Sequence, residues 1–164
     1  MAEATGRRLG SIRQLRWDDW DFERSTIRWR SEADKKGRDA VIPVPESLIA
    51  EVKAFRIKMG GAFGGLVFPS EKNRDEPVDR HELRTWLELA EKHAKLPKLE
   101  GSLWHAYRRA WATSRKHLPV SDVAQPGGWK DLSTLLRCYT QADNHTMLAV
   151  MSEPRKVMEK AVSR

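Results

Sequence analysis

Apolar residues recur at helical spacing in several parts of the chain, and short polar segments rich in glycine or proline separate these parts. A first amphipathic helix is predicted over 6–15, where Leu9, Ile12 and Leu15 share one face. Further helices are predicted at 45–59, 79–96, 103–118 and 132–139, followed by a tail from about residue 144. The segment 119–128, which holds two prolines and ends in two glycines, is expected to form at most one helical turn.

Two strands are predicted in the first third of the chain. Residues 25–30 alternate between polar and apolar side chains, as a half-buried strand does, and 40–44 form a second apolar segment. The polar segment 34–39 between them is a turn with Lys35 and Lys36 at its tip, so the pair is an antiparallel hairpin. The fold class is therefore α+β, a mainly helical domain with a small antiparallel β-sheet near the N-terminus.

Length and composition describe a single globular domain. With 164 residues, 40% of them hydrophobic and 32% charged, the chain can bury a core without disulfide bonds. No apolar run approaches the roughly 20 residues that a membrane span requires, and no signal peptide opens the sequence. The single cysteine, Cys138, excludes an internal disulfide framework and a cysteine-built metal site. These features predict a cytoplasmic protein without a membrane partner.

The charge balance indicates a polyanionic partner. Thirty Lys and Arg against 23 Asp and Glu give a formal net charge of +7 and a pI near 9.8. Nucleic acid is the first candidate for such a partner. The alternative is that the charge serves solubility alone.

Four places offer side chains suited to bind or attack a phosphate, and in chain order they are Arg8, Lys35, His105 with Arg108, and Tyr139 preceded by Trp129. Each of them also has an ordinary structural interpretation. Arg8 would be a surface charge and Lys35 a solvated turn residue. Trp129 would serve only as a core residue.

The pattern His-x-x-Arg occurs twice, as His81 to Arg84 and as His105 to Arg108. The first copy lies at the start of a charged helix, and its side chains are expected to face water. The second lies among apolar residues, which suits the wall of a pocket. The alternative for His105 is a core histidine with a satisfied hydrogen bond.

The order and spacing of these motifs resemble the tyrosine recombinase (phage integrase) family over nearly the whole chain. The matching motifs are Thr5-Gly6-Arg7-Arg8, Lys35-Lys36-Gly37-Arg38 before Ile42-Pro43-Val44, His105-Ala106-Tyr107-Arg108, Gly128-Trp129, and Tyr139. The resemblance implies a catalytic site made of Arg8, Lys35, His105, Arg108, Trp129 and Tyr139. The chain departs from the family at Ser11, where an acidic residue is common, and this serine is expected to support the site through its hydroxyl.

The implied reaction is metal-independent cleavage and rejoining of DNA, with no cofactor. Two arginines hold the phosphate, because guanidinium stays charged and matches two phosphate oxygens. Tyr139 attacks the phosphorus with help from His105 and forms a 3′-phosphotyrosyl intermediate. Lys35 protonates the departing 5′ oxygen, and Trp129 donates its indole N–H to the phosphate.

The resemblance also predicts domain organisation and partners. Residues 1–164 correspond to a single catalytic domain without the family's N-terminal core-binding domain, and 144–164 form a tail helix suited to dock on a neighbouring subunit. Double-stranded DNA is the expected partner, with self-association on DNA, as a tetramer in the full-length family. Two rival interpretations are a type IB topoisomerase-like enzyme and a truncated, non-catalytic DNA-binding remnant.

Overall fold

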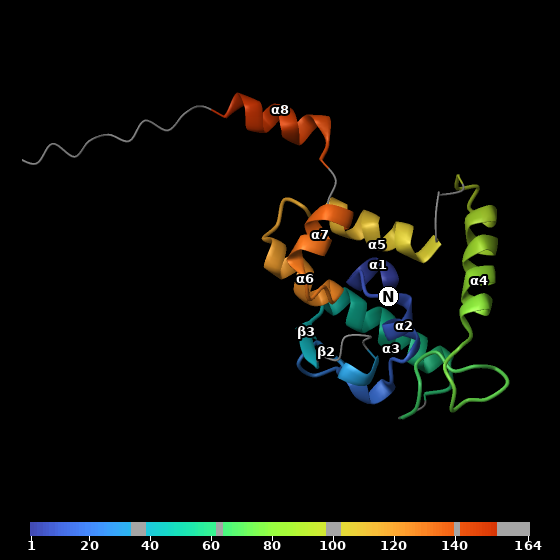
Figure 1. Cartoon of the computed structure of the whole chain (residues 1–164). Helices are drawn as coiled ribbons and strands as arrows, with labels where there is room; N and C mark the ends of the chain where they lie inside the picture. The colour runs from blue at the N-terminus through green and yellow to red at the C-terminus, as the bar shows by residue number, and fades with distance from the viewer. Residues whose placement is uncertain (34–38, 62–63, 98–102, 140–141, 154–164) are drawn as a thin grey trace, which may run out of the picture.

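A computed structural model of the chain describes residues 1–33, 39–61, 64–97, 103–139 and 142–153 (Figure 1). Helices dominate these residues, which confirms the predicted fold class. The helices are α1 (Ala2–Thr5), α2 (Leu9–Arg13), α3 (Glu46–Lys58), α4 (Arg80–His93), α5 (Leu103–Ser114), α6 (Val120–Gly127), α7 (Leu132–Tyr139) and α8 (Asn144–Ser152). The strands are β1 (Trp20–Asp21), β2 (Thr26–Trp29) and β3 (Ala40–Pro43), and two short 3₁₀ turns, η1 (Trp17–Asp19) and η2 (Ser31–Ala33), precede β1 and follow β2.

The three strands form one antiparallel sheet in the order β1-β2-β3. Ile27 of β2 lies opposite Trp20 on one side and Ile42 on the other. The predicted hairpin of β2 and β3 is confirmed. Strand β1 was not predicted, because only two of its residues pair and so no alternating pattern can develop.

One hydrophobic core joins the sheet to α2 and α3. Alternate residues of β2 point into it, and Ile27 and Trp29 are both almost completely buried. Helix α3 adds apolar residues from one face, as its sequence pattern predicts. The buried members are Ile12, Leu15, Trp17, Trp20, Ile27, Trp29, Ile42, Leu48, Ile49, Val52 and Val67.

A second core lies where α5, α6 and α7 pack together (Figure 1). Its buried members are Trp111, Ala112, Val123, Ala124, Trp129 and Leu135. The prediction of at most one helical turn in 119–128 is wrong, since α6 has eight residues. Pro126 lies in its last turn, and burial of Val123 and Ala124 outweighs the cost of the proline at this position.

The helix predicted over 6–15 begins only at Leu9 and ends at Arg13, as α2, and a separate short helix, α1, precedes Gly6. Gly6 adopts the left-handed conformation with φ 63°, which ends α1, and α2 begins at Leu9. A Cβ atom on Gly6 would lie 2.4 Å from the Trp111 ring, so a side chain there would collide with the second core. The break therefore brings the start of the chain against α5.

Helices α4 and α8 lie at the periphery of this body (Figure 1). The predicted cap of α4 is confirmed, since the Asp79 carboxylate accepts the backbone N–H of His81 at 2.7 Å. Helix α4 is tied to α5 by a 3.0 Å hydrogen bond from the Tyr107 hydroxyl to the buried Glu91 carboxylate. None of the helices in the described part of the chain is long and apolar enough to cross a membrane.

Candidate active site

Arg8 and Arg108 come from opposite parts of the chain and meet at the end of α6. Arg108 lies on α5 and is only 2% exposed, and its Nη1 donates hydrogen bonds to the carbonyl oxygens of Gly6 and Gly127. Arg8 precedes α2, and its Nη1 donates to the carbonyl oxygen of Gly128 at 3.3 Å. The two guanidinium groups are therefore held by two consecutive carbonyls.

The Trp129 ring packs against the guanidinium of Arg108. The Arg108 Cζ atom lies 3.5 Å from the centroid of the Trp129 ring, which is a close cation–π contact. The same ring stacks on Trp111 of the second core, with centroids 6.1 Å apart. Gly127 is packed so tightly that a Cβ there would lie 1.9 Å from Trp129. These contacts place Trp129 next to the predicted site, and they also make it a core residue.

Arg7 contributes to this region, although the sequence motifs indicate no role for it. Its side chain is buried, and it donates from Nε to the carbonyl of Pro126 at 2.6 Å and from Nη2 to that of Gln125 at 3.1 Å. Its guanidinium also lies 4.7 Å from the ring centroid of Trp29 in β2. Arg7 thus joins the sheet to the end of α6. The signal available in the sequence was a charged residue directly before Arg8.

His105 lies on α5 and faces the solvent-accessible side of this region. Partial desolvation lowers the pKa of its imidazole, and the positive charges of Arg108, Arg109 and Arg8 lower that pKa further. The ring is therefore neutral at neutral pH and able to accept a proton. The alternative that His105 is a core histidine is wrong, because the side chain is exposed.

A cleft of ≈ 610 Å³ opens beside these residues. Its basic and imidazole lining comprises Arg8, Arg80, His81, Arg84, His105 and Arg108. Both His-x-x-Arg motifs therefore face the same cleft. The first copy was expected to face water. His81 and Arg84 are indeed exposed, and they lie on the wall of the cleft. Ser11 is buried and also lines the cleft.

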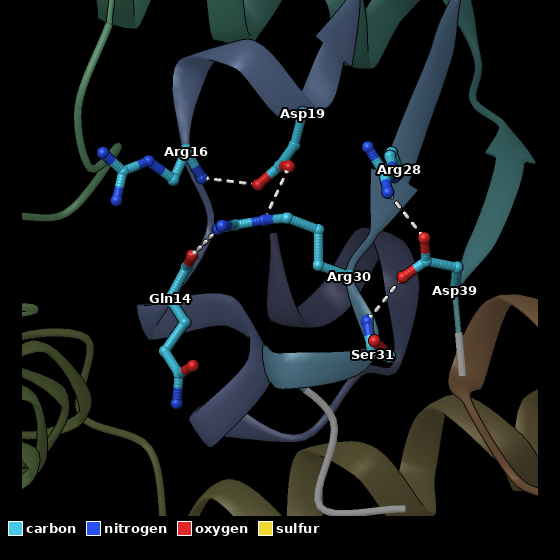
Figure 2. A network of polar contacts seen from close by, with 7 residues as sticks. All are labelled: Gln14, Arg16, Asp19, Arg28, Arg30, Ser31 and Asp39. Carbon is cyan, nitrogen blue, oxygen red and sulfur yellow. Dashed lines mark hydrogen bonds and ion pairs between the residues drawn. The ribbon is translucent and has the colours of Figure 1, made fainter. Parts of the chain in front are cut away.

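Lys35 lies outside the described residues, but hydrogen bonds join the residues on either side of 34–38. Asp39 accepts the Ser31 N–H at 2.7 Å and a hydrogen bond from the Arg28 Nη2 at 2.6 Å (Figure 2), which ties together the residues on either side of 34–38. These two interactions lower the pKa of Asp39, with the Arg28 contact as the larger cause. Ala33, two residues before Lys35, lines the cleft.

The segment before the turn is fixed as well. Arg30 donates from Nη2 to the carbonyl of Gln14 at 2.8 Å, and its Nε lies 2.9 Å from a carboxylate oxygen of the buried Asp19 (Figure 2). The other oxygen of Asp19 accepts the backbone N–H of Arg16 at 2.8 Å. The end of β2 is thereby attached to the segment that follows α2.

Tyr139 is the last residue of α7, and the position of its side chain lies outside what the structure describes. Helix α7 packs on α5 and buries Leu135 in the second core. Asp131 caps its first turn, accepting hydrogen bonds from the side chains and backbone N–H groups of Ser133 and Thr134. The structure thus brings together Arg8, His105, Arg108 and Trp129 and places the helix of Tyr139 against the same α5.

Comparison with solved structures finds the same fold in three recombination proteins. XerA recombinase matches with a TM-score of 0.73 and 21% identity, over 94% of this chain and 55% of its own. XerH site-specific recombinase bound to a difH substrate, in a pre-cleavage complex, matches with a TM-score of 0.68 and 22% identity over 92% of this chain and 44% of its own. The Tn1549 transposon integrase in complex with circular intermediate DNA matches with a TM-score of 0.68 and 18% identity over 92% of this chain and 56% of its own.

The chain thus spans about half the length of the solved proteins it matches. Comparison with curated protein sequences finds no match. The model of the phage integrase family, by contrast, matches residues 1–146 of the 164. The predicted resemblance is confirmed, and the chain belongs to the phage integrase family.

Proposed function

We propose that this fold is the catalytic domain of a site-specific DNA recombinase, which cleaves and rejoins DNA through a 3′-phosphotyrosyl intermediate. The observation that carries the proposal is the convergence of Arg8, Arg108 and His105 on one cleft. Two guanidinium groups held by adjacent carbonyls can bind one phosphodiester from two directions. The membership of the phage integrase family supports the same reaction.

The arginines act by stabilising charge in the transition state. Attack on a phosphodiester concentrates negative charge on the non-bridging oxygens, and fixed cations at these oxygens lower the barrier. Arg108 is buried and held by two carbonyls and by the Trp129 ring, so little reorganisation is needed when DNA binds. Arg8 is partly exposed and reaches the phosphate from the wall of the cleft at the start of α2.

Proton transfer is assigned to His105, Tyr139 and Lys35. The neutral imidazole of His105 takes the phenolic proton as the Tyr139 oxygen bonds to phosphorus. The bond from phosphorus to the 5′ oxygen breaks, and Lys35 gives that oxygen a proton. Reversal by another 5′ hydroxyl releases Tyr139 and joins the strands. The placement of Ala33 at the cleft and of α7 against α5 supports these two assignments.

Double-stranded DNA is the proposed partner. The net charge of +7 and the cationic cleft are suited to a polyanion, and the solved complexes of XerH and the Tn1549 integrase contain DNA. We extend the proposal to a second copy of the chain, which α8 contacts through its exposed apolar residues. These are Met147, Leu148, Val150 and Met151, with exposed fractions of 48%, 68%, 74% and 83%. Sedimentation of the protein with and without duplex DNA measures this association, and a monomer in both conditions would contradict it.

Covalent trapping tests the reaction. The protein is incubated with a pool of random-sequence duplexes that carry a nick, so that a cleaved strand loses its short 5′-hydroxyl fragment and cannot be rejoined. Denaturing electrophoresis is expected to show protein linked to labelled DNA, and Tyr139→Phe is expected to abolish the adduct while leaving binding intact. Adducts that persist in Tyr139→Phe would contradict the assignment of the nucleophile.

The same assay separates the rival functions. Binding without any adduct would indicate a non-catalytic DNA-binding domain. Relaxation of supercoiled plasmids irrespective of their sequence would indicate a topoisomerase. Recovery and sequencing of the trapped strands is expected instead to show one enriched target site.

A further inference from the structure

The first turns of α4 form a second cationic wall of the cleft. Arg80, His81 and Arg84 line it from one side, whereas Arg8 and Arg108 line it from the other. The volume of ≈ 610 Å³ lies within the range of about 300–1,000 Å³ that encloses drug-sized ligands. The cleft is therefore larger than a single phosphate group requires, and its charge extends beyond the proposed cleavage site.

Arg80 reaches across from α4 to α2. Its Nη2 lies 3.5 Å from the position that a Cβ atom of Gly10 would occupy, so the guanidinium covers the first turn of α2. Gly10 follows Arg8 by two residues, so the Arg80 side chain lies close to the segment that carries Arg8.

The cations in this region repel one another in the absence of an anion. Desolvation lowers the pKa of Arg13 on α2, and the positive charge of Arg80 lowers that pKa further, while Asp79 opposes the effect. Among the described residues that line the cleft, Glu32 supplies the single carboxylate against four arginines. A bound anion would relieve this repulsion.

The end of α4 itself does not provide the anion site. The Asp79 carboxylate already accepts the N–H of His81, and the Glu82 carboxylate accepts the N–H of Asp79 at 3.2 Å. These two acidic side chains occupy the N-terminal amides that would otherwise attract an anion. Arg84 is paired with Glu88 at 2.9 Å on the exposed surface. Arg80 is therefore the residue of α4 best placed to bind an anion in the cleft.

We propose that Arg80 binds a DNA backbone phosphate adjacent to the phosphate held by Arg8 and Arg108. This inference rests on the proposed function, because it takes DNA as the occupant of the cleft. Phosphates of one strand follow each other at a rise of about 3.4 Å along the duplex axis, so a strand that enters the cleft presents several of them. A second phosphate contact fixes the register of the strand at the cleavage site without reading its bases.

The salt dependence of DNA binding tests this contact. Affinity for a random-sequence duplex is measured between about 50 and 200 mM salt for the parent protein, Arg80→Gln, Arg80→Lys and Arg24→Gln. Arg24 lies outside the cleft, with a side chain that is 84% exposed, and its substitution changes the net charge by the same amount. Thermal melting followed by circular dichroism verifies that each variant is folded.

Arg80→Gln is expected to reduce the slope of log affinity against log salt by about 0.9, the value for one phosphate contact. Arg80→Lys is expected to keep the slope, because the charge is retained, and Arg24→Gln is expected to leave it unchanged. Equal slopes for Arg80→Gln and Arg24→Gln would overturn the inference.

The outcome is distinguishable from failure of the proposed function. A trapped adduct combined with an unchanged slope for Arg80→Gln refutes the phosphate contact and leaves the recombinase proposal intact. A reduced slope without any adduct in the parent protein supports the contact and refutes the catalytic proposal. Lack of duplex binding by the parent protein at low salt refutes both.

Discussion

Substitution of Gly128 by alanine would strain the centre of the candidate site. Gly128 has φ 70°, a left-handed conformation that costs a residue with a side chain about 1–2 kcal/mol. A Cβ atom there would also lie 2.4 Å from Nη1 and 2.9 Å from Cζ of Arg7. The guanidinium of Arg7 is buried and hydrogen-bonded, so it cannot move away without losing a contact.

The size of the effect follows from these two contributions. Loss of one hydrogen bond from a charged donor such as Arg7 costs about 1.5–3 kcal/mol. Together with the backbone strain, Gly128→Ala should reduce the free energy of unfolding by about 2.5–5 kcal/mol. Arg8, whose Nη1 donates to the Gly128 carbonyl, would be displaced by the same shift.

Gly61 provides a matched control. It has φ +72°, nearly the same conformation, but no atom of the described residues lies within 4 Å of the position of its Cβ. Gly61→Ala should therefore cost only the backbone strain of about 1–2 kcal/mol. Thermal denaturation followed by circular dichroism compares the two variants with the parent protein.

The melting temperature of Gly128→Ala is expected to lie roughly 4–8 °C below that of Gly61→Ala, since about 2 kcal/mol more is lost and each 1 kcal/mol corresponds to about 2–4 °C in a domain of this size. Equal melting temperatures for the two variants would refute the argument. They would show that Arg7 yields to a side chain at 128 without cost, and hence that its contacts do not hold the end of α6.

Three further predictions concern the same part of the molecule. Trp129→Ala should lower the free energy of unfolding by about 3–5 kcal/mol in chemical denaturation, because a buried ring is removed from beneath Arg108, and a loss below about 1 kcal/mol would contradict its place in the core. The rate of adduct formation should stay constant down to pH values below the pKa of free histidine and then fall, because the pKa of His105 is lowered and the imidazole stops acting as a base only when it is protonated. A pH profile that His105→Gln leaves unchanged would contradict this role. Hydrogen bonds from the Thr134 and Ser133 side chains lower the pKa of Asp131 to about 2 from 3.8. The stability that the Asp131 carboxylate contributes is therefore complete above about pH 4 and is lost as the pH falls toward 2. The difference in melting temperature between the parent and Asp131→Ala should shrink over that range.

Local patterns in the sequence were sufficient for those elements whose determinants are local. The alternation in 25–30 predicts β2, the apolar segment 40–44 predicts β3, and the Asp79 cap predicts the start of α4. The end of α1 at Gly6 was not predicted, because Gly6 packs tightly against the ring of Trp111, a residue distant in the sequence. The length of α6 was underestimated for the same kind of reason, since its stability comes from packing rather than from helix propensity.

In the candidate site, too, some features could be predicted from the sequence and others could not. The order of the motifs predicts that Arg8, His105 and Arg108 share a site, and the structure brings these three residues to one cleft. The contacts of Arg7 could not be predicted, because its partners are backbone carbonyls that no residue type reveals. The catalytic roles of all six residues, Arg8, Lys35, His105, Arg108, Trp129 and Tyr139, remain predictions from the motifs.

The adjacent carbonyls of Gly127 and Gly128 make the two arginines one thermodynamic unit. Because a displacement of this short segment withdraws an acceptor from Arg8 and from Arg108 together, damage to either arginine's support reaches the other. Energetic coupling in such a shared network is typically about 0.5–3 kcal/mol, and the effects of separate substitutions are then not additive. Once one of these carbonyl contacts is lost, a second substitution in this segment would have little further effect. Phosphate binding by the two arginines would therefore be lost in a single step rather than by degrees.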